Sequence, residues 1–218
     1  MFLKGKIRRM FEDRQEAGKK LAQELLVYKD KKNLLVLAIP RGGVVVGKEL
    51  SRALNCPLDV LVTKKIGAPG NPELAIGAVG PKGLMVLNKD LALRTGADQK
   101  YLDDQKKVKS GEVRRKMRLF NKRKRVIDLK GKRVILTDDG IATGATIEVA
   151  IKWIKAQKPK KVVLAVPVAA PDSLAKLTPL VDEVVCLEKP FFFAAVGQFY
   201  QTFPQTTSEE VVNLLKEK

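Results

Sequence analysis

The sequence contains no histidine and only two cysteines among its 218 residues. Without histidine there is no Ser-His-Asp or Cys-His catalysis, so carboxylates, lysines or groups of a bound ligand must carry any chemistry. Cys56 and Cys186 lie far apart in apolar surroundings and belong to no Cys-x-x-Cys pair. We therefore expect reduced core cysteines rather than a disulfide or a structural metal site.

Long apolar runs are also missing. No stretch approaches the roughly 20 residues that a membrane-spanning helix needs, and the charged N-terminus lacks the apolar core of a signal peptide. We expect a cytoplasmic protein with no membrane partner. Because 45% of the residues are hydrophobic, the chain can bury a full core, and we predict a single domain over residues 1–218.

Residues 134–146 form the most informative segment of the chain. They begin with an apolar run typical of a buried parallel strand and continue with two aspartates and a loop of small residues. Apolar residues then recur at helical spacing, at Ile147, Ala150, Ile151 and Ile154. Free N–H groups at the start of a helix bind anions, so this loop suits a phosphate.

The acidic pair and the loop suit different parts of one ligand. Asp138 and Asp139 cannot bind a phosphate, but they can accept hydrogen bonds from a sugar diol or stand near magnesium. Gly144 lets the backbone approach an anion closely, and Thr143 and Thr146 add hydroxyl donors. The segment therefore indicates a sugar-phosphate site, and an ordinary strand-turn-helix is the alternative.

A second apolar run, residues 34–39, is broken by Pro40, Arg41, Gly42 and Gly43 before another helical pattern begins. Two consecutive glycines permit unusual backbone torsions and expose N–H groups, while the Arg41 guanidinium can bind a phosphate with two hydrogen bonds. Taken alone, the segment could be a plain turn. It lies one β-α-β unit before the acidic pair, which favours a second anion-binding loop.

A third segment, residues 64–74, carries Gly or Pro at many positions, and we predict a mobile loop without regular structure. Lys64 and Lys65 stand at its base. They are either contacts for an anionic ligand or two solvated lysines at the end of a strand.

Together the three segments resemble the signature of the type I phosphoribosyltransferases, closest to members from bacteria and archaea without a settled substrate. In that family the 140–146 loop holds the 5-phosphate of phosphoribosyl pyrophosphate, the two acids hold the ribose hydroxyls, and the Arg-Gly-Gly loop holds the pyrophosphate. A mobile loop closes over the ligand, and a basic residue at its base touches the leaving group. Lys65 is preferred over Lys64 for that contact. The resemblance also implies a cis peptide bond between Pro40 and Arg41.

The resemblance implies catalytic roles for Arg41, Lys65, Asp138 and Asp139. It implies substrate contacts for the remaining loop residues, which are Pro40, Gly42, Gly43, Lys64, Gly140, Ile141, Ala142, Thr143, Gly144, Ala145 and Thr146. Magnesium is the implied cofactor and would be held mainly through the ligand, with Asp138 and Asp139 nearby. Family members are commonly dimers, so we expect a homodimer.

The order of the apolar patterns predicts an α/β fold with a doubly wound parallel sheet of about five strands, flanked by helices. Strands are expected at 34–39, 58–63, 133–137, 161–167 and 183–187, and helices at 13–28, 44–54, 145–157 and 172–177. An insertion over 64–132 should add the mobile loop, a hairpin of 75–79 with 84–87, and a helix over 99–123. Residues 188–218 should form a C-terminal hood.

Two features bear on the partners. Residues 100–133 contain 15 Lys and Arg against four acids, a net charge of +11. This span could bind RNA or DNA, but only Tyr101 and Phe120 are aromatic among its charges, and a solvated helix that draws anionic substrates is favoured. The aromatic residues gather in the tail, where one ring could stack on a planar heterocycle or pack onto the core or a dimer interface.

The predicted activity is transfer of the phosphoribosyl group to a small nitrogen heterocycle with release of pyrophosphate. Ala142 limits the choice of acceptor. Hypoxanthine and guanine enzymes of the family usually carry an Asp there as general base, so a 6-oxopurine acceptor is disfavoured. The alternative is a non-catalytic regulator that senses phosphoribosyl pyrophosphate and binds nucleic acid through the basic insertion.

Overall fold

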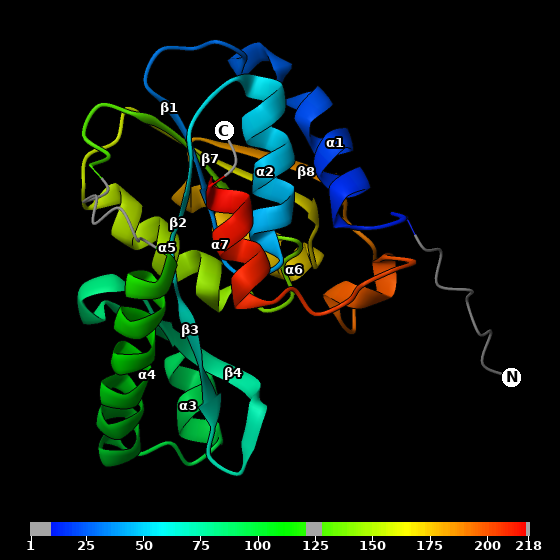
Figure 1. The fold of residues 1–218 in the computed structure, drawn as a ribbon. Helices are drawn as coiled ribbons and strands as arrows, with labels where there is room; N and C mark the ends of the chain where they lie inside the picture. The colour runs from blue at the N-terminus through cyan, green and yellow to red at the C-terminus, as the bar shows by residue number, and fades with distance from the viewer. Residues whose placement is uncertain (1–9, 121–127, 217–218) are drawn as a thin grey trace, which may run out of the picture.

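A computed structural model describes residues 10–120 and 128–216. Five strands form one parallel sheet in the order β2-β1-β6-β7-β8 (Figure 1). Their bounds are β1 Leu34–Ala38, β2 Leu58–Val60, β6 Arg133–Thr137, β7 Lys161–Val168 and β8 Glu183–Glu188. The predicted α/β fold with a five-strand parallel sheet is confirmed.

Helices cover both faces of this sheet. They are α1 Arg14–Glu24, α2 Gly43–Leu54, α5 Ala145–Lys155 and α6 Pro171–Leu177. Short 3-10 helices at Leu26–Tyr28, Thr178–Leu180 and Val196–Phe199 join the elements. The helix predicted over 13–28 is thus divided, and the strand predicted over 58–63 ends at Val60 because the chain then crosses to a second sheet.

The second sheet is antiparallel and has the order β3-β4-β5. Its strands are β3 Lys64–Ala68, β4 Asn71–Val79 and β5 Met85–Leu87, with a 3-10 turn at Pro81–Gly83. The prediction that residues 64–74 lack regular structure was wrong. Gly70 takes a φ of +70° at the turn, and Gly67 sits at an irregular register where a Cβ would lie 2.6 Å from the Pro72 backbone. Its Gly and Pro residues therefore build a hairpin with a bulge.

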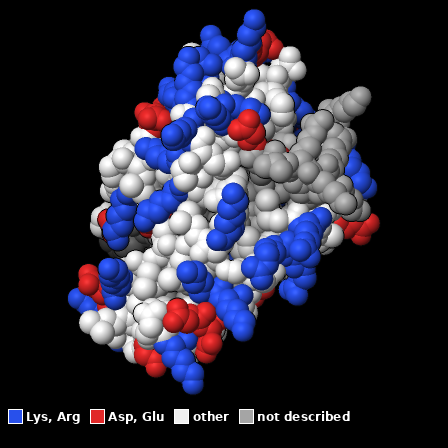
Figure 2. All heavy atoms as spheres, turned by 90° about the vertical axis from the view of Figure 1, so that its left-hand side faces the viewer, with Lys and Arg blue, Asp and Glu red and all other residues white. Residues whose placement is uncertain are grey.

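Two helices follow the small sheet, α3 Lys89–Arg94 and α4 Gln99–Phe120. The predicted 75–79 with 84–87 hairpin is present as β4 and β5, and the predicted end of the basic helix at Arg123 lies outside the described residues. Figure 2 shows Lys and Arg spread over the face that carries α4, with uncharged surface and acidic residues between them. Among the residues that the structure describes, this distribution differs from a single continuous basic patch.

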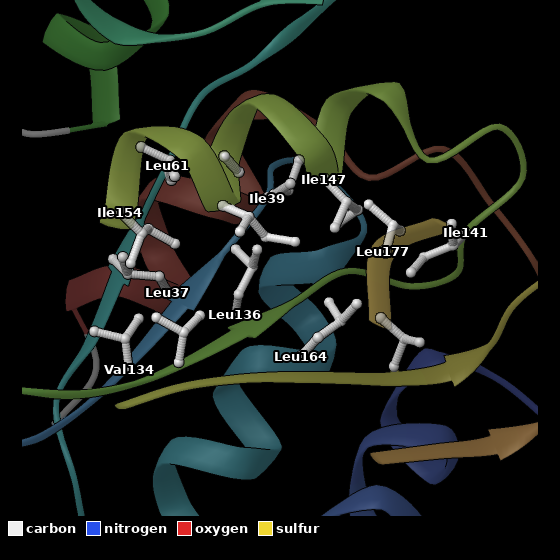
Figure 3. Close-up of a cluster of buried hydrophobic side chains, with 14 of the residues drawn as sticks. Leu37, Ile39, Leu61, Val134, Leu136, Ile141, Ile147, Ile154, Leu164 and Leu177 are labelled. Carbon is white, nitrogen blue, oxygen red and sulfur yellow. The ribbon is translucent and has the colours of Figure 1, made fainter. Parts of the chain in front are cut away.

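The core follows the alternation of side chains along the parallel strands. Leu37, Leu136 and Leu164 point toward α5, where Ile147 and Ile154 meet them (Figure 3). The intervening residues, such as Val36, Ile135 and Val163, pack against α1 and α2 on the opposite face. Because both faces of these strands are buried, their sequences are nearly continuous apolar runs.

The tail returns to the same body. Residues after β8 pack Phe199 and Tyr200 onto Phe11 of the N-terminal segment and Val168 of β7. Helix α7, Ser208–Lys216, then lies beside α2 and contacts α4. No helix within the described ranges is long and apolar enough to cross a membrane.

Candidate active site

The two predicted anion-binding loops leave neighbouring strands at the same edge of the sheet. β1 and β6 pair in parallel, with Ala38 opposite Thr137. Gly42 and Gly43 then press against the acidic pair. A Cβ on Gly42 would lie 1.9 Å from Asp139 Oδ2, and one on Gly43 would lie 2.7 Å from the Asp138 Cα. Only glycine fits at either position without displacing the carboxylates.

The two aspartates have different surroundings. Asp139 accepts a hydrogen bond from the Arg14 Nε at 2.7 Å, and this ion pair is largely buried. The Asp138 carboxylate accepts a hydrogen bond from the Asp139 backbone N–H at 2.8 Å. Burial raises the pKa of Asp138 well above its usual range, and the negative charge of Asp139 raises it further. The pair thus combines an ion-paired carboxylate with one that favours its protonated form.

Arg14 ties the acidic pair to the tail. Its Nη1 donates to the Pro204 carbonyl oxygen at 2.7 Å, and its guanidinium lies 3.6 Å from the centroid of the Phe203 ring. The Tyr200 hydroxyl donates to the backbone carbonyl of Asp139. No local motif in the sequence marks Arg14, and Tyr200 was predicted only as one of the tail aromatic residues that stack on a heterocycle or pack onto the core.

The 140–146 loop closes the same edge. Gly144 has a φ of +77° and directly precedes α5, whose first turn therefore begins without a side-chain cap. Thr143 is exposed, and the Ala142 carbonyl accepts a hydrogen bond from Ser173 of α6. Gly140 packs against Val196 of the tail, where a Cβ would approach the valine within 2.6 Å. A pocket lined in part by Ala142, Thr143 and Ala145 lies beside the start of α5, and free backbone N–H groups at a helix start suit an anion.

The first two residues of β3 point to different neighbours. Lys64 pairs with Glu112 of α4 at 3.3 Å and is half-buried. Lys65 is exposed and pairs with Glu73 of β4 at 2.8 Å. Burial lowers the pKa of Lys116 on α4, and the positive charges of Lys64 and Arg41 lower it further. The peptide bond between Pro40 and Arg41 is cis.

The aromatic residues of the tail separate into two groups. Phe199 and Tyr200 are buried, and Phe193 and Phe203 pack with them. Phe191 and Phe192 are 87% and 82% exposed and meet edge to face at a centroid distance of 5.1 Å. The packed group fixes the tail to the core, and Phe191 and Phe192 take no part in that packing.

A model of the phosphoribosyl transferase domain matches residues 10–201. The chain belongs to this family. Two Mycobacterium tuberculosis proteins, one named "Putative phosphoribosyl transferase Rv0571c", are 44% identical to it over 207 residues. The match covers 95% of this chain but 46% of each relative, so the chain spans about half of their length.

Solved structures agree with this family. The crystal structure of TT1426 from Thermus thermophilus is 42% identical, covers 94% of this chain and 97% of its own, and superposes with a TM-score of 0.77. AQ2163 from Aquifex aeolicus has 18% identity and a TM-score of 0.52, over 81% of this chain and 74% of its own, which supports the fold alone. The resemblance inferred from the three phosphoribosyl transferase motifs is confirmed.

Proposed function

We propose that this phosphoribosyl transferase family member transfers the phosphoribosyl group of phosphoribosyl pyrophosphate to a nitrogen heterocycle. The observation that carries the proposal is the contact between Gly42 and Gly43 and the acidic pair, Asp138 and Asp139. It brings a loop suited to pyrophosphate against carboxylates suited to ribose hydroxyls. Phosphoribosyl pyrophosphate carries a pyrophosphate and ribose hydroxyls on the same sugar, so it can contact the loop and the carboxylates at once.

In the proposed reaction the acceptor nitrogen forms a bond to the anomeric carbon while the bond from that carbon to the pyrophosphate oxygen breaks. Arg41 and the N–H groups of Gly42 and Gly43 stabilise the charge that develops on the leaving pyrophosphate. Asp138 and Asp139 hold the ribose hydroxyls, which orients the ring as positive charge develops on it. In this proposal the rate enhancement comes from the orientation of the ribose and from stabilisation of the charge on the leaving pyrophosphate.

The remaining loop residues hold the other end of the donor. We assign the 5-phosphate to the backbone of Gly140, Ile141, Ala142, Gly144 and Ala145, with hydroxyl donors from Thr143 and Thr146. We prefer Lys64 to Lys65 as the contact for pyrophosphate, because Lys64 pairs with Glu112 of α4 and acts with Arg41 on Lys116, while Lys65 pairs with Glu73. Pro40 positions Arg41.

Magnesium fits as a companion of the ligand. Mg²⁺ commonly binds one or two carboxylates together with substrate phosphates. Asp139 is engaged by Arg14, and no cluster of three acidic or sulfur ligands occurs within the described ranges. Asp138 and Asp139 would therefore stand beside a magnesium ion that arrives with the donor. When bound, the ion neutralises part of the pyrophosphate charge.

Ala142 bears on the acceptor. Its methyl group cannot take a proton, and its carbonyl is held by Ser173, so a 6-oxopurine that needs a base at this position is disfavoured. We assign the acceptor to the broader class of nitrogen heterocycles. A homodimer also remains a prediction.

The donor assignment is tested by isothermal titration calorimetry with phosphoribosyl pyrophosphate and magnesium. The double variant Asp138→Asn, Asp139→Asn should lose binding, because each amide has no charge and puts an NH2 donor in place of one of the two acceptor oxygens. The matched control is Asp172→Asn, which alters an exposed carboxylate on α6 at the same edge of the sheet. Thr146→Val serves as a second probe because it removes one hydroxyl from the phosphate loop.

Wild-type affinity in the folded double variant would overturn the donor assignment. Release of pyrophosphate is then measured against a panel of purines, pyrimidines and other heterocycles. Donor binding without turnover of any acceptor would favour the sensing role over the transferase role. Binding of RNA or DNA that falls steeply with salt would add support to the regulator.

A further inference from the structure

Helix α4 is anchored so that one of its faces must look toward the candidate site. Val113, Met117 and Phe120 pack in a cluster with Val44 of α2, the end of β2 and Val211 of α7. Val44 lies two residues after Gly42. The apolar anchor therefore sits directly behind the Arg-Gly-Gly loop, and the neighbouring stripe of α4 is held beside that loop.

That stripe carries charged residues at helical spacing. Lys109, Glu112 and Lys116 follow at i, i+3 and i+7, which places them on one side of the helix. Glu112 pairs with Lys109 at 2.9 Å and with Lys64 of β3 at 3.3 Å. All four side chains belong to residues that are partly buried, in contrast to the exposed Lys106, Lys107, Arg114 and Arg115 elsewhere on α4.

The cluster holds more positive than negative charge. Lys64 and Lys109 both pair with the Glu112 carboxylate, and Lys116 feels the positive charges of Lys64 and Arg41. Burial lowers the pKa of Lys116, and the positive charges of Lys64 and Arg41 lower it further, while Glu112 opposes this. Cations gathered in a partly desolvated place repel one another, and a multivalent anion among them relieves that repulsion.

We propose that α4 completes the pyrophosphate subsite, with Lys116 and Lys109 as direct contacts for the leaving pyrophosphate. Glu112 is a stand-in anion that holds Lys64 and Lys109 in place until the donor arrives. The inference rests on the proposed function, because it adds residues to the same subsite. It also gives the basic helix a task that requires no nucleic acid.

The test uses the full chain and titrates sodium pyrophosphate, and separately phosphoribosyl pyrophosphate, by calorimetry at fixed ionic strength. Lys116→Gln should weaken both ligands between about tenfold and a hundredfold, the range for a lost hydrogen bond to a charged group. Lys107→Gln removes the same charge from an exposed position of α4 and should change neither affinity by more than about twofold.

Two further variants separate direct contact from a structural role. Lys116→Arg should restore most of the affinity, and its pyrophosphate binding should fall less at alkaline pH than that of wild type, because a guanidinium stays charged where a lysine begins to lose its proton. Glu112→Gln should bind pyrophosphate more tightly, because the ligand no longer displaces a carboxylate from Lys64 and Lys109. A variant that merely loosened the helix would weaken binding instead.

The outcomes distinguish this inference from the proposed function. If wild type binds phosphoribosyl pyrophosphate and folded Lys116→Gln binds it equally well, the subsite proposal fails while the donor assignment stands. If Lys107→Gln weakens binding as much as Lys116→Gln, the general positive potential of α4 explains the affinity without a direct contact from Lys116, and the proposal fails. If wild type binds neither probe, both proposals fail.

Discussion

The ion pair between Arg14 and Asp139 allows a quantitative test of how the tail supports the site. The side chains are 10% and 16% exposed, and the Nε–Oδ2 distance is 2.7 Å. Arg14→Met keeps the aliphatic length but leaves Asp139 unpaired beside Asp138, and it removes the donor to the Pro204 carbonyl. Breaking one side of a buried pair costs about 3–5 kcal/mol in the free energy of unfolding.

Urea denaturation at pH 7 measures this loss, with Lys152→Met as the control. That variant breaks the pair of Lys152 with Glu148, which has a similar distance of 2.7 Å but side chains 49% and 37% exposed. An exposed pair of this spacing is worth about 0.3–0.5 kcal/mol. The two pairs have the same N–O distance, so the variants differ in the burial of the pair and in the further contacts of Arg14 with Pro204 and Phe203.

A second substitution identifies the cause of the loss. Asp139→Asn in the Arg14→Met background removes the unpaired carboxylate and should recover part of the stability. If Arg14→Met costs no more than Lys152→Met, or if Asp139→Asn adds a further loss to it, Arg14 does not hold Asp139 and the reasoning is refuted.

Two further predictions follow from pKa shifts. Because the folded-state pKa of Asp138 is raised, its contribution to stability is present below the unfolded value of about 3.9 and is lost as pH rises through the folded pKa. Asp138→Asn should thus melt above wild type at pH 7 and show a smaller gap at pH 4; a constant gap would contradict this. Burial raises the pKa of the Cys56 and Cys186 thiols to about 11 from 9.0, so the thiolate fraction falls about a hundredfold and reaction with a disulfide reagent at pH 8 should be far slower than in urea. Equal rates would refute it.

The parallel sheet could be predicted because its strands are buried on both faces. Val134 and Leu136 pack toward α5 and Ile135 packs toward α2. A strand buried on both faces has a continuous apolar sequence, which is the pattern that was recognised. The 140–146 loop and the acidic pair were also visible as a motif, since their residues are consecutive in the sequence, and their binding roles stay predictions. Local order and local chemistry were enough for these parts.

What the sequence missed depends on contacts between distant residues. Arg14 and Asp139 are 125 positions apart, and no sequence pattern near either residue predicts that they form an ion pair. The hairpin of β3 and β4 was missed for another reason. Gly67 and Gly70 resemble loop breakers in the sequence, but their positions match a bulge and a turn. Likewise, the charge of α4 was counted correctly, while the face that meets Lys64 is decided by how Val113 and Phe120 pack.

The small antiparallel sheet joins the two ends of the candidate site. One face packs Ile66 and Ile76 against α3 and α4, and the other packs Ala78 and Val86 against Val149 of α5. The same sheet thus braces both the helix with the cationic stripe and the helix that begins at the phosphate loop. A ligand that contacts both helices binds only when this sheet is folded. Binding should therefore stabilise the sheet, and local opening of β3–β5 should become rarer when the site is filled.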